Sequence, residues 1–227
     1  MREYSAFDIL GPIMIGPSSS HTAGAARMAK VSKMIAGGNI KKVKFLLHGS
    51  FAQTYRGHGT DKALVAGMLG MNPWDDRLRD SFKIAEEEGL EFEFIETDLG
   101  EDMHPNTVKF VITRDEDKTV EIVGSSIGGG NIIITEIDGE KLEFTGEYPT
   151  IITKHVDVPG IIAKVSDLLY KQDINVAFMK VYRTGKGKTA CMVIQADSEI
   201  PRDIIDKIKS IPKVMKAQVI NPMKEDE

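Results

Sequence analysis

The chain has 227 residues, 41% of them hydrophobic, and a net charge of −5, so it can form a real core in one large domain or two small ones. No cluster of basic residues stands out, which disfavours nucleic acid and anionic membranes as partners. No apolar run approaches the roughly 18 residues of a membrane span, and no apolar signal-peptide segment is present, so we expect a cytoplasmic protein. The single cysteine, Cys191, excludes an internal disulfide and a cysteine-rich metal site within this chain.

The first predicted helix runs from about Thr22 to Ala36, because apolar residues recur there at helical spacing. Ser20 or Thr22 is the expected N-cap, and the glycines that follow Ala36 end the helix. A strand is predicted next, over residues 41–49.

A second helix is predicted after Gly59, with Thr60 or Asp61 as its cap, and it is apolar on nearly every side over residues 63–69. Such a helix is typical of a buried position. A solvated helix is expected over 76–88. Strands are expected over 91–96, 107–113, 119–126 and 131–137. The first half is therefore α+β.

The second half predicts the order βαββαβ, which is the ferredoxin-like arrangement. Its strands are expected at 150–156, 174–183, 188–197 and 213–220, and its helices at 161–172 and from Pro201 to about Ser210. Proline suits the first turn of the second helix. Gly146 and Pro149 break regular structure at the join. We expect domains over 1–146 and 149–222, and a polar tail over 223–227.

Two clusters of small residues and histidine precede the first two helices. The first holds Ser18, Ser19, Ser20, His21 and Thr22. A helix N-terminus carries unpaired N–H groups and partial positive charge, so these hydroxyls either cap the helix or help to bind an anion. In the second cluster, Gly57 and Gly59 flank His58, which lets the backbone approach a ligand closely.

Three further patterns carry less chemical information. The segment 104–106 (His-Pro-Asn) is either a rigid polar turn or part of a functional site. Residues 126–132 form a glycine-rich turn that lacks the spacing of a nucleotide-binding loop. A serine hydrolase lacks support because there is no GxSxG elbow. A zinc site built from His21, His58 and His104 is conceivable, but no pair has the helical ligand spacing.

Taken together and in this order, the motifs GPSSSHTAGAAR, GSFAQTYRGHGTDKA, HPNTVKF and SIGGGNI resemble the β subunit of the two-chain, iron–sulfur-dependent L-serine dehydratase family. The resemblance covers nearly the whole chain. It implies a first domain similar to the allosteric substrate-binding domain of some phosphoglycerate dehydrogenases. It also implies that the second is an ACT domain, a βαββαβ module that commonly binds small amino acids and often pairs into dimers.

The family resemblance implies a reaction that removes water from L-serine and yields pyruvate and ammonia. That chemistry uses a 4Fe–4S cluster as Lewis acid on the departing hydroxyl. One cysteine cannot hold such a cluster, so the resemblance implies that a separate α subunit carries it and that this chain alone is inactive.

Residue roles follow from the resemblance and from the chemistry. His58 is the expected base for the Cα proton, because histidine titrates near working pH, and His21 is the second catalytic candidate. The expected substrate-binding residues are Ser18, Ser19, Ser20, Thr22, Gly57, Gly59, Thr60, Asp61, His104 and Asn106. The expected effector loop holds Asp157, Pro159 and Gly160.

Two other classes of protein stay open at this point. A regulatory amino-acid-binding protein would use both halves as a sensor, with catalysis elsewhere. An assembly scaffold would bind no ligand. The ACT-like half does not choose between the classes, because such modules regulate many unrelated enzymes.

Overall fold

The computed structural model describes residues 13–222, apart from the side chain of Glu116. The chain divides into two compact units, with the boundary between Gly139 and Glu140. The domain limits expected from the sequence, 1–146 and 149–222, stay a prediction, and the expected tail at 223–227 lies outside the described residues. No helix within the described part of the chain is long and apolar enough to cross a membrane.

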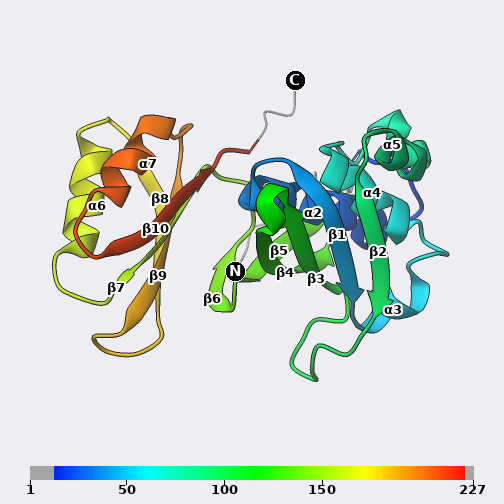
Figure 1. The fold of residues 1–227 in the computed structure, drawn as a ribbon, viewed down its shortest axis with the longest axis horizontal. Helices are drawn as coiled ribbons and strands as arrows, with labels where there is room; N and C mark the ends of the chain where they lie inside the picture. The colour runs from blue at the N-terminus through cyan, green and yellow to red at the C-terminus, as the bar shows by residue number, and fades with distance from the viewer. Residues whose placement is uncertain (1–12, 223–227) are drawn as a thin grey trace. The chain divides into compact units, whose positions relative to one another are not determined.

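A mixed sheet dominates the first unit (Figure 1). Its strand order is β2-β1-β3-β4-β5-β6, and the last strand, β6, follows the boundary between the units. The strands are β1 (Ile40–Leu47), β2 (Glu91–Glu96), β3 (Thr107–Arg114), β4 (Thr119–Gly128), β5 (Asn131–Ile137) and β6 (Glu140–Phe144). Only the β1–β2 pair is parallel among the four pairs whose register is defined, which run from β2 to β5. The sequence predicted every one of these strands except β6.

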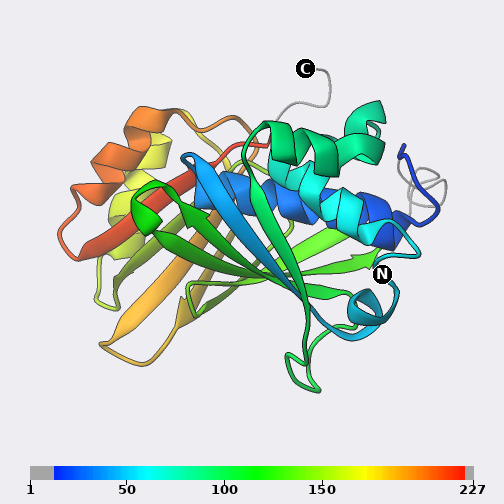
Figure 2. The same ribbon diagram turned by 45° about the vertical axis from the view of Figure 1, so that its right-hand side comes forward.

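Two helices, α2 (Ala25–Ala36) and α4 (Thr60–Leu69), run beside each other on one side of this sheet (Figure 2). They approach so closely that a Cβ on Gly67 would lie 2.2 Å from the carbonyl oxygen of Ala26. Six consecutive α4 residues, 63–68, are buried, which confirms the prediction of a buried helix. The described part of this unit also contains the helical segments η1 (Ser19–Gly24), α3 (Gly49–Thr54), η2 (Asp76–Asp80), α5 (Ser81–Glu87) and η3 (Asp115–Asp117).

The beginnings of both main helices differ from the prediction. A π-helical turn, η1 (Ser19–Gly24), precedes α2, and its N-cap is Ser18, whose hydroxyl accepts a hydrogen bond from the backbone N–H of His21 at 3.1 Å. The predicted caps Ser20 and Thr22 are therefore wrong, because both lie inside the turn. The predicted caps of α4 are also wrong: Gly59 is the N-cap, at a φ of 68° that favours glycine.

The second unit confirms the predicted βαββαβ order. Its elements are β7 (Thr150–Val156), α6 (Ile161–Tyr170), β8 (Val176–Arg183), β9 (Thr189–Ala196), α7 (Arg202–Lys209) and β10 (Val214–Ile220). The antiparallel sheet has the order β10-β7-β9-β8, which is the ferredoxin-like order. Pro201 is the N-cap of α7 and does not lie in its first turn. The fold class is therefore α+β, as predicted.

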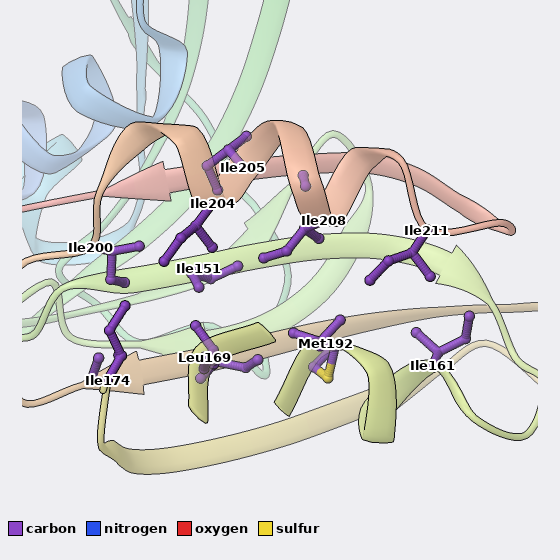
Figure 3. Packing of buried hydrophobic residues seen from close by; sticks show 14 residues of the cluster. Ile151, Ile161, Leu169, Ile174, Met192, Ile200, Ile204, Ile205, Ile208 and Ile211 are labelled. Atoms are coloured by element: carbon purple, nitrogen blue, oxygen red, sulfur yellow. The ribbon is translucent and has the colours of Figure 1, made fainter. Parts of the chain in front are cut away.

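Aliphatic side chains fill the core of this second unit. Ile161, Val165 and Leu169 of α6 belong to one buried cluster with Ile151 and Met192 of the sheet. Figure 3 shows these side chains together with the isoleucines of α7. The amphipathic pattern of α6 therefore predicted the buried face correctly.

Candidate functional site

The two histidines singled out in the sequence are neighbours in the first unit. The ring centroids of His21 and His58 are 4.8 Å apart. His21 lies in the turn η1, and His58 lies in the segment between α3 and α4. The hydroxyl of Thr22 joins the two segments by donating to the carbonyl oxygen of His58 at 3.3 Å. The first two sequence motifs therefore form one local cluster.

Both ring nitrogens of His21 have hydroxyl neighbours. Nδ1 lies 3.4 Å from Oγ of Ser18, and Nε2 lies 3.2 Å from Oγ of Ser50. The edge of the ring also packs against Phe51, with the ring centroids 5.0 Å apart. Burial, and secondarily the neighbouring His58, lower the pKa of His21. His21 is therefore held in one orientation and favours the neutral form.

One hydrogen bond of His58 indicates which of its nitrogens carries the hydrogen. Its Nδ1 lies 3.3 Å from the carbonyl oxygen of Thr54. A carbonyl only accepts hydrogen bonds, so Nδ1 carries the hydrogen in this contact and the neutral ring has its lone pair on Nε2. The hydroxyl of Thr54 in turn donates to the carbonyl oxygen of Ser50 at 2.7 Å, within α3. The helix α3 thus fixes both histidines.

The third motif, at residues 104–106, packs against the beginning of α3. Gly49 has a φ of 57°, and a Cβ there would lie 2.7 Å from the carbonyl oxygen of Pro105. The N–H of Phe51 donates to the same oxygen at 3.3 Å. Only glycine allows this approach at position 49.

The fourth motif, at the end of β4, completes the cluster. The N–H of Ser126 donates to the carbonyl oxygen of Asn106 at 3.0 Å. The side chain of Ser126 lies against the turn η1, because a Cβ on Gly24 would be 2.1 Å from its Oγ. All four motifs therefore meet, in the order η1, α3, residues 104–106, the end of β4, and η1 again.

Several predicted site residues have a structural role in this arrangement. His104 is exposed, and its Nδ1 accepts from the N–H of Asn106 at 3.1 Å, which shapes the turn. Gly59 caps α4, whereas Gly57 has a negative φ and room for a side chain. Asp61 accepts from the N–H of Lys62, and burial raises its pKa.

The other predicted residues differ in exposure and contacts. Ser19 and Ser20 lie in the turn η1 and are half-buried. Thr60 is fully buried, and its Oγ1 has no hydrogen-bond partner within residues 13–222. The role of each of these residues in binding stays a prediction.

Ser50 and Ser126 were missed as site residues. Ser50 follows Gly49 at the start of a six-residue helix that the sequence did not predict, so its approach to His21 had no sequence signal. Ser126 lies in the buried part of β4, two residues before its end, where the sequence gives no reason to distinguish a serine from an ordinary strand residue. The sequence did offer one signal for them, since Ser50 lies in the second of the four motifs and Ser126 in the fourth.

The expected effector loop lies in the second unit and is tied to the β8–β9 turn. Oδ2 of Asp157 accepts from Nε of Arg183 and from the N–H of Gly187, each at 3.0 Å. The hydrogen bonds from Arg183, followed by that from Gly187, lower the pKa of Asp157. Pro159 and Gly160 are exposed, and Gly160 caps α6 with a φ of 92°. Whether this loop binds an effector stays a prediction.

The residues of this chain do not fit an iron–sulfur cluster. The only thiol, Cys191, is buried in β9, and burial raises its pKa to about 11, whereas cluster ligands are several thiolates. Across residues 13–222, no group of three or more histidine, cysteine, aspartate or glutamate side chains could hold a metal ion.

Comparison with known proteins places the chain in a family. Residues 5–87 match the family model for the serine dehydratase beta chain, and residues 150–213 match that for the ACT domain. The chain is 40% identical to the "L-serine dehydratase, beta chain" of Peptoniphilus asaccharolyticus, over 97% of this chain and 99% of that one. It is 43% identical, with the same coverage, to the "Probable L-serine dehydratase, beta chain" of Bacillus subtilis (strain 168).

A more distant likeness involves a different enzyme. The "D-3-phosphoglycerate dehydrogenase" of Methanocaldococcus jannaschii is 29% identical over 87% of this chain, but only over 37% of its own length. The two dehydratase chains match at higher identity and from end to end. The chain therefore belongs to the serine dehydratase beta chain family and carries an ACT domain.

Proposed function

We propose that this chain is the β subunit of an iron–sulfur L-serine dehydratase, which deaminates L-serine to pyruvate and ammonia together with a cluster-bearing α subunit. The similarity over nearly the full length to chains named as β chains of L-serine dehydratase carries this proposal. A β chain implies a partner chain. The contacts that join the four motifs, together with the proximity of His21 to His58, support a shared site on the first unit.

The 4Fe–4S cluster belongs to the α subunit in this proposal. Cys191 is the only cysteine of this chain and is buried within a strand, so it can supply at most one ligand. We therefore expect the isolated chain to be inactive.

His58 acts as the general base. Its Nε2 takes the Cα proton of L-serine, and loss of the hydroxyl group then gives aminoacrylate, which rearranges and hydrolyses to pyruvate and ammonia. The contact of Nδ1 with the carbonyl oxygen of Thr54 supports this role, because it leaves the lone pair on Nε2. His21 orients the cluster of hydroxyls beside His58, since both of its nitrogens are engaged.

The hydroxyl-rich turn from Ser18 to Thr22 binds the carboxylate of L-serine. Its amide groups lie at the positive end of the continuous helical segment η1–α2, which favours an anion. The low pKa of His21 does not contradict this role, because the hydroxyls and amides donate without a charged imidazole.

The proposal includes pairing of ACT domains into a homodimer and an effector at residues 157–160. Large apolar side chains that are exposed on the second unit, Ile162 and Tyr170 of α6 and Phe178 of the edge strand β8, support pairing. Light scattering of the purified chain measures it, and a monomer at micromolar concentration contradicts it.

Anaerobic reconstitution tests the proposed function. Pyruvate formation from L-serine is measured for this chain, for the cysteine-bearing α chain, and for the mixture. We expect pyruvate only from the mixture. A Cys191→Ser variant should give the same iron and sulfide content per complex, because this chain holds no cluster. Binding of L-serine by this chain without turnover in the mixture would favour the regulatory amino-acid sensor instead.

A further inference from the structure

Two polar residues, Asn106 and Ser126, are neighbours where β3 begins and β4 nears its end. Thr107, the first residue of β3, pairs with Ser125, and just beyond this pair the N–H of Ser126 donates to the carbonyl oxygen of Asn106 at 3.0 Å. This backbone hydrogen bond joins the two residues, which together are called the polar spot.

This polar spot has unused hydrogen-bonding capacity. Ser126 is fully buried. Within residues 13–222, neither Oγ of Ser126 nor the buried Oδ1 of Asn106 has a hydrogen-bond partner. Buried polar atoms are nearly always paired, because an unpaired one has lost its water without compensation. Two such atoms on residues that are joined by a hydrogen bond therefore point to a ligand that pairs with them.

Ser126 lies on the same face of the sheet as the turn that carries His21. Gly24 of that turn contacts Ser126, and Met28 of α2 packs over Gly124, two residues earlier on the same strand. Ser126 thus faces η1 from the sheet side. The opposite face of the sheet holds Ser125, whose hydroxyl pairs with Thr107 at 2.7 Å.

The chemistry of the two atoms selects the class of ligand. Oδ1 of asparagine only accepts hydrogen bonds, and a serine hydroxyl accepts as well as donates. A carboxylate also only accepts, so it cannot pair with Asn106 Oδ1. An ammonium group has three N–H donors and fits both atoms.

We propose that Asn106 Oδ1 and Ser126 Oγ bind the α-ammonium group of the amino-acid substrate. This inference rests on the proposed function and deepens it, because it assigns a new residue, Ser126, and says which end of the substrate lies at the sheet. The carboxylate then lies at the turn from Ser18 to Thr22. Because Gly24 of η1 packs against the side chain of Ser126, the turn η1 shifts when the substrate binds.

Competitive inhibition of the reconstituted two-chain enzyme tests this assignment. L-alanine and L-lactate share a carboxylate and a methyl group, and L-lactate has a hydroxyl where L-alanine has the ammonium group. For Ser126→Ala we expect the inhibition constant of L-alanine and the KM for L-serine to rise roughly 10- to 100-fold, the usual loss for a hydrogen bond to a charged group. The inhibition constant of L-lactate should change less than about threefold.

Two serine variants serve as matched controls. Ser125→Ala changes the neighbouring residue on the opposite face of the same strand. Ser32→Ala removes another fully buried hydroxyl without a partner in the described chain, in α2. Neither should change the ratio of the two inhibition constants. Ser126→Ala should not lower the melting temperature, because its hydroxyl makes no hydrogen bond in the free chain.

The outcomes separate this inference from the proposed function. A wild-type complex that forms no pyruvate from L-serine overturns the proposed function, and this assignment with it. Turnover by the wild type together with an unchanged ratio in Ser126→Ala overturns the assignment alone. A substrate-bound crystal structure with a water molecule on both atoms, and the ammonium group elsewhere, overturns it as well.

Discussion

The two units of the chain differ in how their helices begin. In the second unit, α6 follows Gly160 and α7 follows Pro201, and both are regular α-helices over an aliphatic core. In the first unit, α2 is preceded by the π-helical turn Ser19–Gly24. Single π-helical turns are rare and occur frequently at functional sites. The irregular beginning lies where His21 contacts Ser18 and Ser50.

Because of this difference, we expect substitutions in the two units to have different effects on stability and activity. In the second unit, the buried side chains pack in one aliphatic core. Those of the first unit's four motifs contact each other across the chain, so one substitution there affects several segments. The following predictions test this difference, from the largest expected effect to the smallest.

The largest effect is expected for His58→Gln in the reconstituted complex. Loss of a general base typically lowers turnover 10²- to 10⁴-fold, and we expect about this decrease in kcat for pyruvate formation. Glutamine keeps an N–H that can donate to the carbonyl oxygen of Thr54, so the melting temperature should stay within about 2 °C of the wild type.

Gln53→Ala is the matched control, because Gln53 is exposed on the same short helix α3. Its turnover should equal that of the wild type. Near-normal turnover in His58→Gln would remove His58 as the base and leave His21 as the remaining histidine candidate of this chain.

A second test compares one glycine from each unit. In Gly24→Ala, the new Cβ would lie 2.1 Å from Oγ and 2.9 Å from Cβ of Ser126, so rotation of the serine cannot relieve the overlap. Overpacking of this kind costs about 1–3 kcal/mol in the free energy of unfolding. In Gly185→Ala, the nearest atom is the flexible Lys188 side chain at 3.2 Å, and the change should stay within about 0.5 kcal/mol.

Urea unfolding of the purified chain measures both glycine variants. The second substitution Ser126→Gly removes the overlapping atoms and should restore part of the stability lost in Gly24→Ala. Equal destabilisation by the two glycine variants would contradict the close packing of η1 on β4.

The second unit could be predicted from the sequence almost element by element. The strand at 150–156 was predicted at its observed limits, and the other elements differ by at most two residues at either end. Local signals suffice there, because the apolar spacing of Ile161, Val165 and Leu169 matches a helix packed on one face of a sheet.

In the first unit, local sequence signals do not predict how the motifs contact one another. The four motifs were identified as candidates, but their convergence depends on contacts such as Gly49 with Pro105 and Gly24 with Ser126, which join distant parts of the chain. The caps were wrong because serine and threonine were assigned to the usual cap position, whereas the turn places Ser18 there and glycine occupies position 59. The strand β6 and the helix α3 are too short to show periodicity.

The smallest effect is expected for Arg183→Ala in the second unit. The side chain of Arg183 donates to Asp157, and this contact is the main cause of the lowered pKa of that carboxyl. A carboxyl whose pKa is lower in the folded than in the unfolded chain stabilises the fold above the unfolded pKa, near 3.8. That stabilisation is lost as the pH falls through the folded pKa.

Arg183→Ala should therefore lower the urea midpoint slightly at pH 7, and the difference from the wild type should vanish at low pH. Lys186→Ala, which removes a positive charge from the same exposed turn, is the matched control and should show no such pH dependence. The N–H of Gly187 continues to donate to Asp157 in both variants, so the loop at 157–160 keeps one of its attachments. If Arg183→Ala lowers stability as much as Gly24→Ala, the contrast between a locally determined second unit and an interlocked first unit is wrong.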